Sequence, residues 1–154
     1  MSGECKRVLV TGVAGLLGSH FAEYLLKIGY DVVGIDNLSG GYRENVPKGV
    51  KFYKMDLCDH QSVSSIVRDN SIDFIYHFAA YAAVGLSPFI RRFNYNNNII
   101  ASANLINAAI QFGVEKFIFA SSMDVYGEQQ PPFTEDLKPQ PLDPYGIAKY
   151  AVEM

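Results

Sequence analysis

Short apolar runs alternate with amphipathic segments along the whole chain of 154 residues. Runs rich in Val, Ile, Phe and Tyr have the length of buried strands, and apolar positions that repeat every three or four residues indicate helices between them. Strands are predicted at residues 7–11, 31–35, 50–55, 73–77 and 116–120. Such alternation is typical of α/β proteins, in which helices connect parallel strands.

The helical segments have recognisable ends. The first runs from 16 to 28, with Phe21 and Leu25 on its apolar face, and Gly29 stops it. Asp56 or Asp59 is expected to cap the start of the next helix. A long helix from 93 to 113 carries a stripe of apolar residues at Ile99, Ala103, Ile106 and Ile110. These elements predict one domain over residues 1–154: a Rossmann-like, doubly wound parallel sheet of order 3-2-1-4-5 with right-handed crossovers.

Three glycines follow the first strand, at Gly12, Gly15 and Gly18. The first can turn the chain sharply, the second leaves room for a pyrophosphate against the backbone, and the third lets helix and strand pack closely. The N-terminus of the following helix then faces the anion with its N–H groups. A dinucleotide-binding turn is therefore predicted, and the alternative is an ordinary strand-to-helix turn.

Asp36 ends the second strand, roughly 20 residues after the glycine turn, where a carboxylate can bind the adenosine ribose. Because its charge would repel a 2′-phosphate, it favours NAD over NADP; alternatively, it only begins the polar loop 37–49, which we expect to be the least ordered region. After the fourth strand, Phe78, Ala79 and Ala80 are predicted to let the chain pass close to the cofactor. His77 is interpreted as a buried core histidine.

Composition limits the class of function. The net charge of −3 argues against binding of nucleic acid or a membrane surface, and the longest nearly uncharged stretch, 74–86, is too short to span a bilayer. Only Cys5 and Cys58 are present, and no residue pattern suggests a metal site. The N-terminus leads directly into the first strand, without room for a signal peptide, so a cytoplasmic location is expected.

Candidate chemistry lies after the fifth strand. Ser122 lies at the end of that strand, and Asp143 and Pro144 begin a helix on which Tyr145 and Lys149 share a face. A nearby ammonium would lower the pKa of the phenol, which would make Tyr145 a proton acceptor, and Ser122 could hydrogen-bond the same substrate oxygen. Tyr145 and Lys149 could alternatively form an ordinary surface pair.

Several ordered motifs resemble the extended short-chain dehydrogenase/reductases that act on nucleotide sugars. They are the spacing Gly12-x-x-Gly15-x-x-Gly18, the segments 77–80, 98–99 and 121–127, and Tyr145-x-x-x-Lys149. Among these enzymes the motifs are most similar to those of the NAD-dependent 4-epimerases. The resemblance implies that Tyr145 takes the proton of a sugar C4 hydroxyl while NAD⁺ accepts the hydride, which then returns to the other face of the sugar.

The resemblance also implies cofactor contacts and partners. Asp56 would lie beside the adenine, Lys149 would hold the nicotinamide ribose, and a UDP-sugar would be the substrate. Further expected cofactor contacts are Leu16, Leu17, Asn37, Leu57 and Asn97. A homodimer formed through the helices 99–112 and 145 onward is also implied.

Three features depart from the family pattern. Asp124 lies where decarboxylases and dehydratases keep Glu, whereas Met123 cannot transfer a proton, which disfavours dehydration. Ala82 replaces a lysine that the 4-epimerases place near the cofactor. Family members also continue into a C-terminal lobe that binds the nucleotide sugar, so the chain is expected to be a fragment or a half-enzyme. A decarboxylase, a dehydratase and a non-catalytic NAD-binding module remain the alternatives.

Overall fold

The computed structural model describes residues 5–154, which form two compact units. The first unit contains the residues up to Ala79 together with Asn104–Ala120, and the second contains Ala80–Ala103 and Ser121–Met154. Residues 1–4, on which part of the expectation of no signal peptide rests, lie outside the described residues. Within residues 5–154, no helix is both long enough and apolar enough to cross a membrane.

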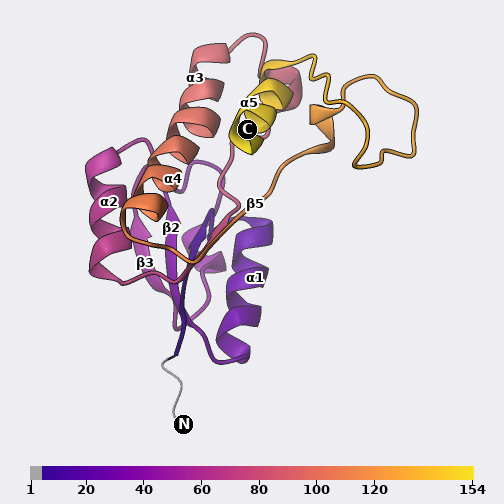
Figure 1. Ribbon diagram of the computed structural model, residues 1–154. Helices are drawn as coiled ribbons and strands as arrows, with labels where there is room; N and C mark the ends of the chain where they lie inside the picture. The colour runs from indigo at the N-terminus through magenta and orange to yellow at the C-terminus, as the bar shows by residue number, and fades with distance from the viewer. Residues whose placement is uncertain (1–4) are drawn as a thin grey trace. The chain divides into compact units, whose positions relative to one another are not determined.

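The first unit is built on a parallel sheet of five strands in the order β3-β2-β1-β4-β5 (Figure 1). This order and the α/β class confirm the prediction. The strands span β1 Arg7–Thr11, β2 Asp31–Asp36, β3 Lys51–Lys54, β4 Phe74–His77 and β5 Lys116–Phe119. Val8 of the central strand β1 pairs with Val32 on one side and with Phe74 on the other, so the carboxyl ends of these strands lie at one edge.

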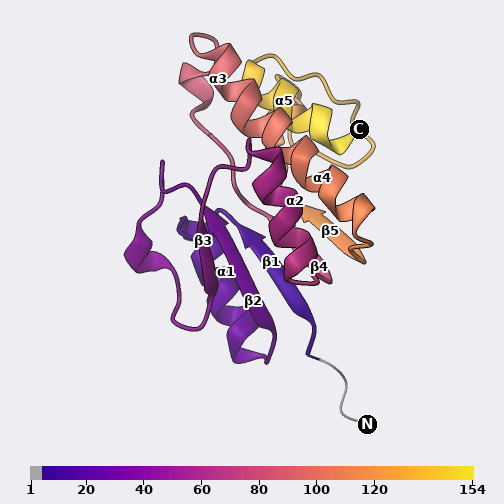
Figure 2. The same cartoon turned by 90° about the vertical axis from the view of Figure 1, so that its left-hand side faces the viewer.

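Helices cover both faces of this sheet. Helix α1 (Leu16–Lys27) lies on one face, and α2 (His60–Asp69) lies on the other with the part of α4 (Ala101–Gln111) that belongs to the first unit (Figure 2). Apolar side chains between the layers are fully buried, among them Leu9, Ile35, Ile75 and Leu105. Burial of such side chains is worth about 2 kcal/mol each and holds the layers together.

The loop between β2 and β3 is more structured than expected. It contains a 3₁₀ turn, η1 (Arg43–Asn45), and Val46 is buried in the core. The Ala14 carbonyl accepts hydrogen bonds from the Tyr42 N–H at 3.2 Å and from Asn45 Nδ2 at 3.1 Å. The expectation that residues 37–49 are the least ordered region is therefore wrong: these bonds fix the loop to the glycine turn, and sequence composition does not reveal them.

The second unit is helical. Its elements are the 3₁₀ turn η2 (Val84–Leu86), α3 (Arg91–Tyr95), the π-helical turn η3 (Asn96–Ile100), the 3₁₀ turn η4 (Met123–Val125) and α5 (Pro144–Glu153). Helix α5 packs against all four of the others. Asp143 caps α5 as predicted, because its carboxylate accepts bonds from the N–H groups of Tyr145 and Gly146 at 2.8 and 3.0 Å.

The predicted long helix is interrupted. It begins at Arg91, and the π-helical turn η3 separates α3 from α4. A π turn closes its hydrogen bonds over five residues instead of four, so it shifts which side chains face the core. The buried positions of α4 include Leu105 and Ala108, whereas Ile110 of the predicted apolar stripe is 76% exposed.

Candidate active site

The glycine turn has the geometry that its sequence predicts. Gly12 has a φ of +68°, and a Cβ there would lie 2.8 Å from the Ala79 backbone nitrogen. A Cβ on Gly18 would overlap the Gly12 carbonyl oxygen, so this glycine permits the close packing of α1 against the turn. Gly15 is the N-cap of α1.

The N-terminus of α1 is open to an anion. No side chain caps it, and its first turn contains no acidic residue. The N–H groups of Leu16 and Leu17 have no carbonyl partner inside the helix, and the side chains of both residues are largely exposed. An uncapped N-terminus of a helix of twelve residues behind a glycine turn fits a pyrophosphate group.

Asp36 ties the glycine turn to the loop that follows β2. Its carboxylate accepts a hydrogen bond from the Ala14 N–H at 3.0 Å and another from the Leu38 N–H at 2.7 Å. Each carboxylate oxygen can accept a second bond, so a ribose hydroxyl can still bind there. The residues of this turn therefore fit an adenine dinucleotide, and Asp36 has a structural task that sequence reasoning missed.

His77 is a core residue, as interpreted from the sequence. It is 1% exposed, and its Nδ1 lies 2.7 Å from Thr11 Oγ1. The same Thr11 oxygen accepts the Ala79 N–H at 3.2 Å. Thr11 therefore fixes the chain after β4 against the glycine turn, a role that sequence analysis did not assign to it. Phe78 is half-buried and contacts the Phe21 ring, with 5.5 Å between the ring centroids.

The expected adenine contacts lie after β3. Asp56 is exposed, and its Oδ1 accepts the Cys58 N–H at 2.8 Å. Asp59 rather than Asp56 caps α2, since its carboxylate accepts the Ser62 N–H at 3.2 Å. The helix-start interpretation of Asp56 is therefore wrong, and its carboxylate lies at the surface. Leu57 is buried.

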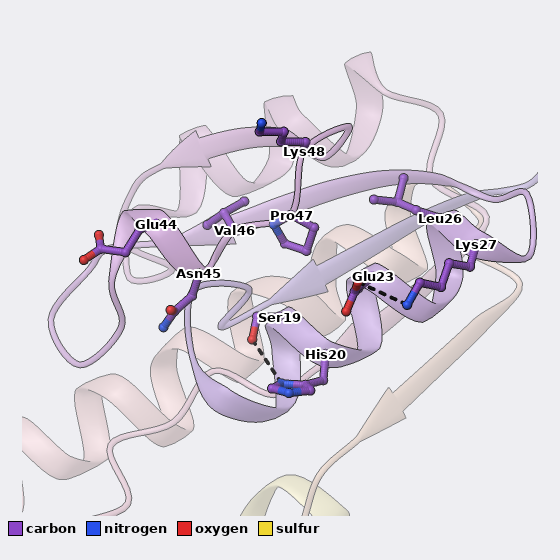
Figure 3. A pocket seen from close by; sticks show the side chains of 10 residues that line it. All are labelled: Ser19, His20, Glu23, Leu26, Lys27, Glu44, Asn45, Val46, Pro47 and Lys48. Carbon is purple, nitrogen blue, oxygen red and sulfur yellow. Dashed lines mark hydrogen bonds and ion pairs between the residues drawn. The ribbon is translucent and has the colours of Figure 1, made fainter.

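Asn37 begins the loop after β2 and forms a tight local turn, in which its Oδ1 accepts the Ser39 N–H at 2.9 Å. A surface pocket of about 630 Å³ lies near this loop, between α1 and residues 44–48 (Figure 3). Its lining carries charges of both signs, and the Lys27 Nζ pairs with Glu23 Oε1 at 3.1 Å. The pocket contains none of the predicted cofactor contacts.

In the second unit, Asn98 is the buried asparagine of the π turn η3. Its side chain bonds both the N–H and the carbonyl of Tyr81, at 3.0 and 3.2 Å, and so holds the segment after Ala80. Asn97, the predicted cofactor contact, is half-buried, and its Nδ2 donates to the Phe93 carbonyl at 2.9 Å.

Ser122 and Asp124 form a hydrogen-bonded pair near Tyr145. Ser122 caps η4, and its Oγ donates to Asp124 Oδ2 at 2.8 Å. Tyr145 is 7% exposed, and the Ser122 side chain lies close enough to influence the pKa of its hydroxyl. The structure therefore brings the predicted serine and tyrosine together, and it adds a carboxylate to them.

The buried Lys149 lies one helical turn after Tyr145, with its Nζ 5.6 Å from the centroid of the tyrosine ring. Burial lowers the pKa of Lys149 to about 8. The pKa of Tyr145 is raised, mainly by burial and further by the charges of Asp124 and Asp143, although the Ser122 side chain lowers it. The expectation that the tyrosine pKa is lowered by Lys149 is thus wrong, because burial disfavours the charged phenolate and is the largest influence on this pKa.

The predicted site residues divide between the two units. The first unit holds the glycine turn with the residues from β2, β3 and β4: Gly12, Gly15, Leu16, Leu17, Gly18, Asp36, Asn37, Asp56, Leu57, Phe78 and Ala79. The second unit holds Ala80, Asn97, Ser122, Tyr145 and Lys149. Among residues 5–154, no cluster of three or more His, Cys, Asp or Glu side chains could hold a metal ion.

Comparison with known proteins agrees with this geometry. Residues 8–154 match the NAD dependent epimerase/dehydratase family. The UDP-glucose 4-epimerase of Bacillus subtilis (strain 168) is 39% identical over 154 residues, which cover 95% of this chain and 45% of the relative. The UDP-glucuronate 4-epimerase of Thermodesulfobacterium geofontis is also 39% identical, over 95% of this chain and 49% of that protein.

Solved structures show the same fold. The UDP-glucose 4-epimerase of Thermotoga maritima, solved with UDP-glucose, has a TM-score of 0.92 and 39% identity, over 96% of this chain and 48% of that one. The enzyme of Thermus thermophilus, solved with NAD, has a TM-score of 0.91 and 42% identity over the same shares. The chain spans about half the length of the relatives it matches. It is a member of the NAD-dependent epimerase/dehydratase family.

Proposed function

We propose that this chain is the NAD-binding and catalytic part of a nucleotide-sugar 4-epimerase that acts on a UDP-sugar. The observation that carries the proposal is that the buried Tyr145 lies near the half-buried Ser122, with the buried Lys149 on the same helix as the tyrosine. It is supported by relatives that are UDP-sugar 4-epimerases. A protein that only bound NAD would have no need of a proton acceptor such as Tyr145.

Each residue has a task in this reaction. Bound NAD supplies a hydride acceptor that can return the hydride. Tyr145, as phenolate, takes the proton of the sugar C4 hydroxyl and later gives it back. Ser122 hydrogen-bonds the same hydroxyl and orients it, while Lys149 holds the nicotinamide ribose.

In the proposed function, the first unit provides most of the contacts that bind NAD. The N–H groups at the start of α1 bind the pyrophosphate, and Asp36 accepts hydrogen bonds from the adenosine ribose. Asp56 and Leu57 flank the adenine, while Asn37, Phe78 and Ala79 are further cofactor contacts of this unit. Ala80 and Asn97 are the contacts that the second unit contributes. The 154 residues alone are expected to bind NAD weakly and to convert little sugar nucleotide, because the relatives are about twice as long.

A fusion tests this function directly. Residues 1–154 are joined to the C-terminal part of the Bacillus subtilis relative, and conversion between UDP-glucose and UDP-galactose is measured. We expect epimerisation by the fusion, its loss in Tyr145→Phe, and none by the C-terminal part alone. A fusion that binds NAD but converts neither sugar would contradict the proposal.

We also propose that the chain forms a homodimer through exposed apolar residues of α4 and α5. Ile110 on α4 is 76% exposed, and Ile147 on α5 is 37% exposed. Apolar side chains exposed on helices are typical of surfaces that bury them against a partner. The mass of the chain in solution tests this, and a monomer at high protein concentration would contradict it.

A further inference from the structure

Asp124 holds Ser122 by two hydrogen bonds. The Ser122 Oγ donates to Asp124 Oδ2 at 2.8 Å, and the Asp124 backbone N–H donates back to the Ser122 Oγ at 3.2 Å. Asp124 belongs to the turn η4, which Ser122 caps, and Gly146 of α5 packs directly on the Asp124 carbonyl oxygen. The carboxylate is thus fixed next to the serine that the proposed reaction uses.

A serine hydroxyl has one proton to donate. Two acceptors compete for it: the carboxylate of Asp124, which receives it in the structure, and the oxygen of Tyr145, whose pKa the same serine lowers. A bond donated by Ser122 stabilises the tyrosine phenolate, whereas a nearby carboxylate destabilises it. Asp124 therefore opposes ionisation of Tyr145 in two ways. Its negative charge disfavours the phenolate, and its carboxylate accepts the hydrogen bond that the Ser122 hydroxyl could otherwise donate to the phenolate.

Two other charged side chains lie near Tyr145, and both belong to α5 or to its N-cap. They are Asp143 at the N-cap of α5, which raises the tyrosine pKa, and Lys149 one turn along the helix. The turns η2 and η3 carry no charged side chain, and Arg91 and Arg92 of α3 are exposed. Among these groups, Asp124 is the acid that contacts Ser122.

We propose that Asp124 is a positioning residue for Tyr145, because its carboxylate takes the Ser122 proton that the tyrosine oxygen would otherwise receive. The Asp124 carboxylate favours the phenol form of Tyr145, and replacing that carboxylate by a neutral side chain releases the Ser122 proton to a forming phenolate. This role rests on the proposed function, in which Tyr145 is the base. In that function, Asp124 sets the pH at which the base becomes available.

The test follows Tyr145 itself and uses neither cofactor nor sugar, so it does not depend on whether the protein is an epimerase. Tyrosine labelled with ¹³C at the ζ carbon is incorporated into the chain, and the NMR signal of Tyr145 is assigned by its loss in Tyr145→Phe. We expect this signal to titrate at lower pH in Asp124→Asn than in the native chain. Asp136→Asn, which removes an exposed carboxylate of the same unit, should leave the titration unchanged.

A second pair of variants separates the effect of the Ser122 hydroxyl proton on the Tyr145 titration from the effect of the Asp124 charge. In a Ser122→Ala background, Asp124→Asn should shift the Tyr145 titration less than it does with Ser122 present, because only the charge effect remains. An equal shift in both backgrounds would overturn the competition for the proton, and no shift in Asp124→Asn would overturn the whole proposal. If Asp124→Asn fails to fold, Asp124→Glu is compared with Asp124→Ala, and only the glutamate should keep the native titration.

Discussion

The Lys149 ammonium lies 5.6 Å from the centroid of the Tyr145 ring. Both side chains are buried, and their burial has a measurable consequence for folding. The pKa of Lys149 is lowered from 10.5 to about 8 because the folded state removes it from water. The folded chain thus binds this proton less tightly than the unfolded chain does.

Lys149→Met should therefore stabilise the chain at neutral pH. Below pH 8, both states of the native chain carry the proton, and the folded state bears the full cost of the buried charge, about 3 kcal/mol. The native chain should gain stability as the pH rises from about 8 towards 10.5, and the advantage of the variant should vanish over the same range. Urea unfolding at several pH values measures this.

Lys138→Met is the control, because Lys138 is exposed in the same unit. Its effect on the free energy of unfolding should be small and independent of pH. If Lys149→Met were equally destabilising at neutral and at high pH, the lysine would not be desolvated as the structure indicates.

Gly146→Ala should damage the packing of α5 in the second unit. A Cβ at this position would lie 2.6 Å from the Asp124 carbonyl oxygen, which is backbone and cannot move aside cheaply. We expect a loss of about 1–3 kcal/mol in the free energy of unfolding. Gly85→Ala is the matched control in the same unit, because no atom lies within 4 Å of its Cβ position. Similar stability of the two variants in urea unfolding would contradict this packing.

Thr11→Val should destabilise the first unit. The variant removes the hydroxyl that bonds the buried His77 ring and accepts the Ala79 N–H. Loss of a partner for buried polar groups costs about 2 kcal/mol. Thr11→Ser keeps the hydroxyl, so it should retain most of the stability in thermal or urea unfolding. If the serine variant lost as much stability as the valine variant, the hydroxyl would not be the cause.

Much of the first unit could be predicted from local sequence signals. The apolar run of β1 gave its bounds, and Gly29 ends α1 with a φ of +91° as a helix-stopping glycine does. Strand order followed from the alternation of strands and helices. The π turn at 96–100 could not be predicted, because no residue pattern distinguishes five-residue hydrogen bonding from ordinary helical bonding.

The chemistry of the candidate site was harder to predict than its residues. Asp143 capping α5 follows from a local signal, as does the placing of Tyr145 and Lys149 on one helix. The direction in which the Tyr145 pKa shifts depends on the burial of the side chain and on its proximity to Asp124. Both are set by tertiary packing. The bond between Asp36 and Ala14 likewise joins residues that only the folded sheet brings together.

Asp36→Asn should weaken NAD binding and reduce the preference for NAD over NADP. The charged acceptor for the ribose hydroxyls is lost, and such bonds are worth about 1.5–3 kcal/mol, so NAD affinity should fall by at least roughly tenfold. The repulsion of a 2′-phosphate is lost as well, so NADP affinity should fall less or rise. The Ala14 and Leu38 N–H groups bind different oxygens of Asp36, so asparagine, with a single acceptor oxygen, can keep only one of these two bonds. Isothermal titration calorimetry with both cofactors measures the two affinities, and Asp31→Asn, at the opposite end of β2, is the control. An unchanged ratio of NAD to NADP affinity in Asp36→Asn would show that another group makes this choice.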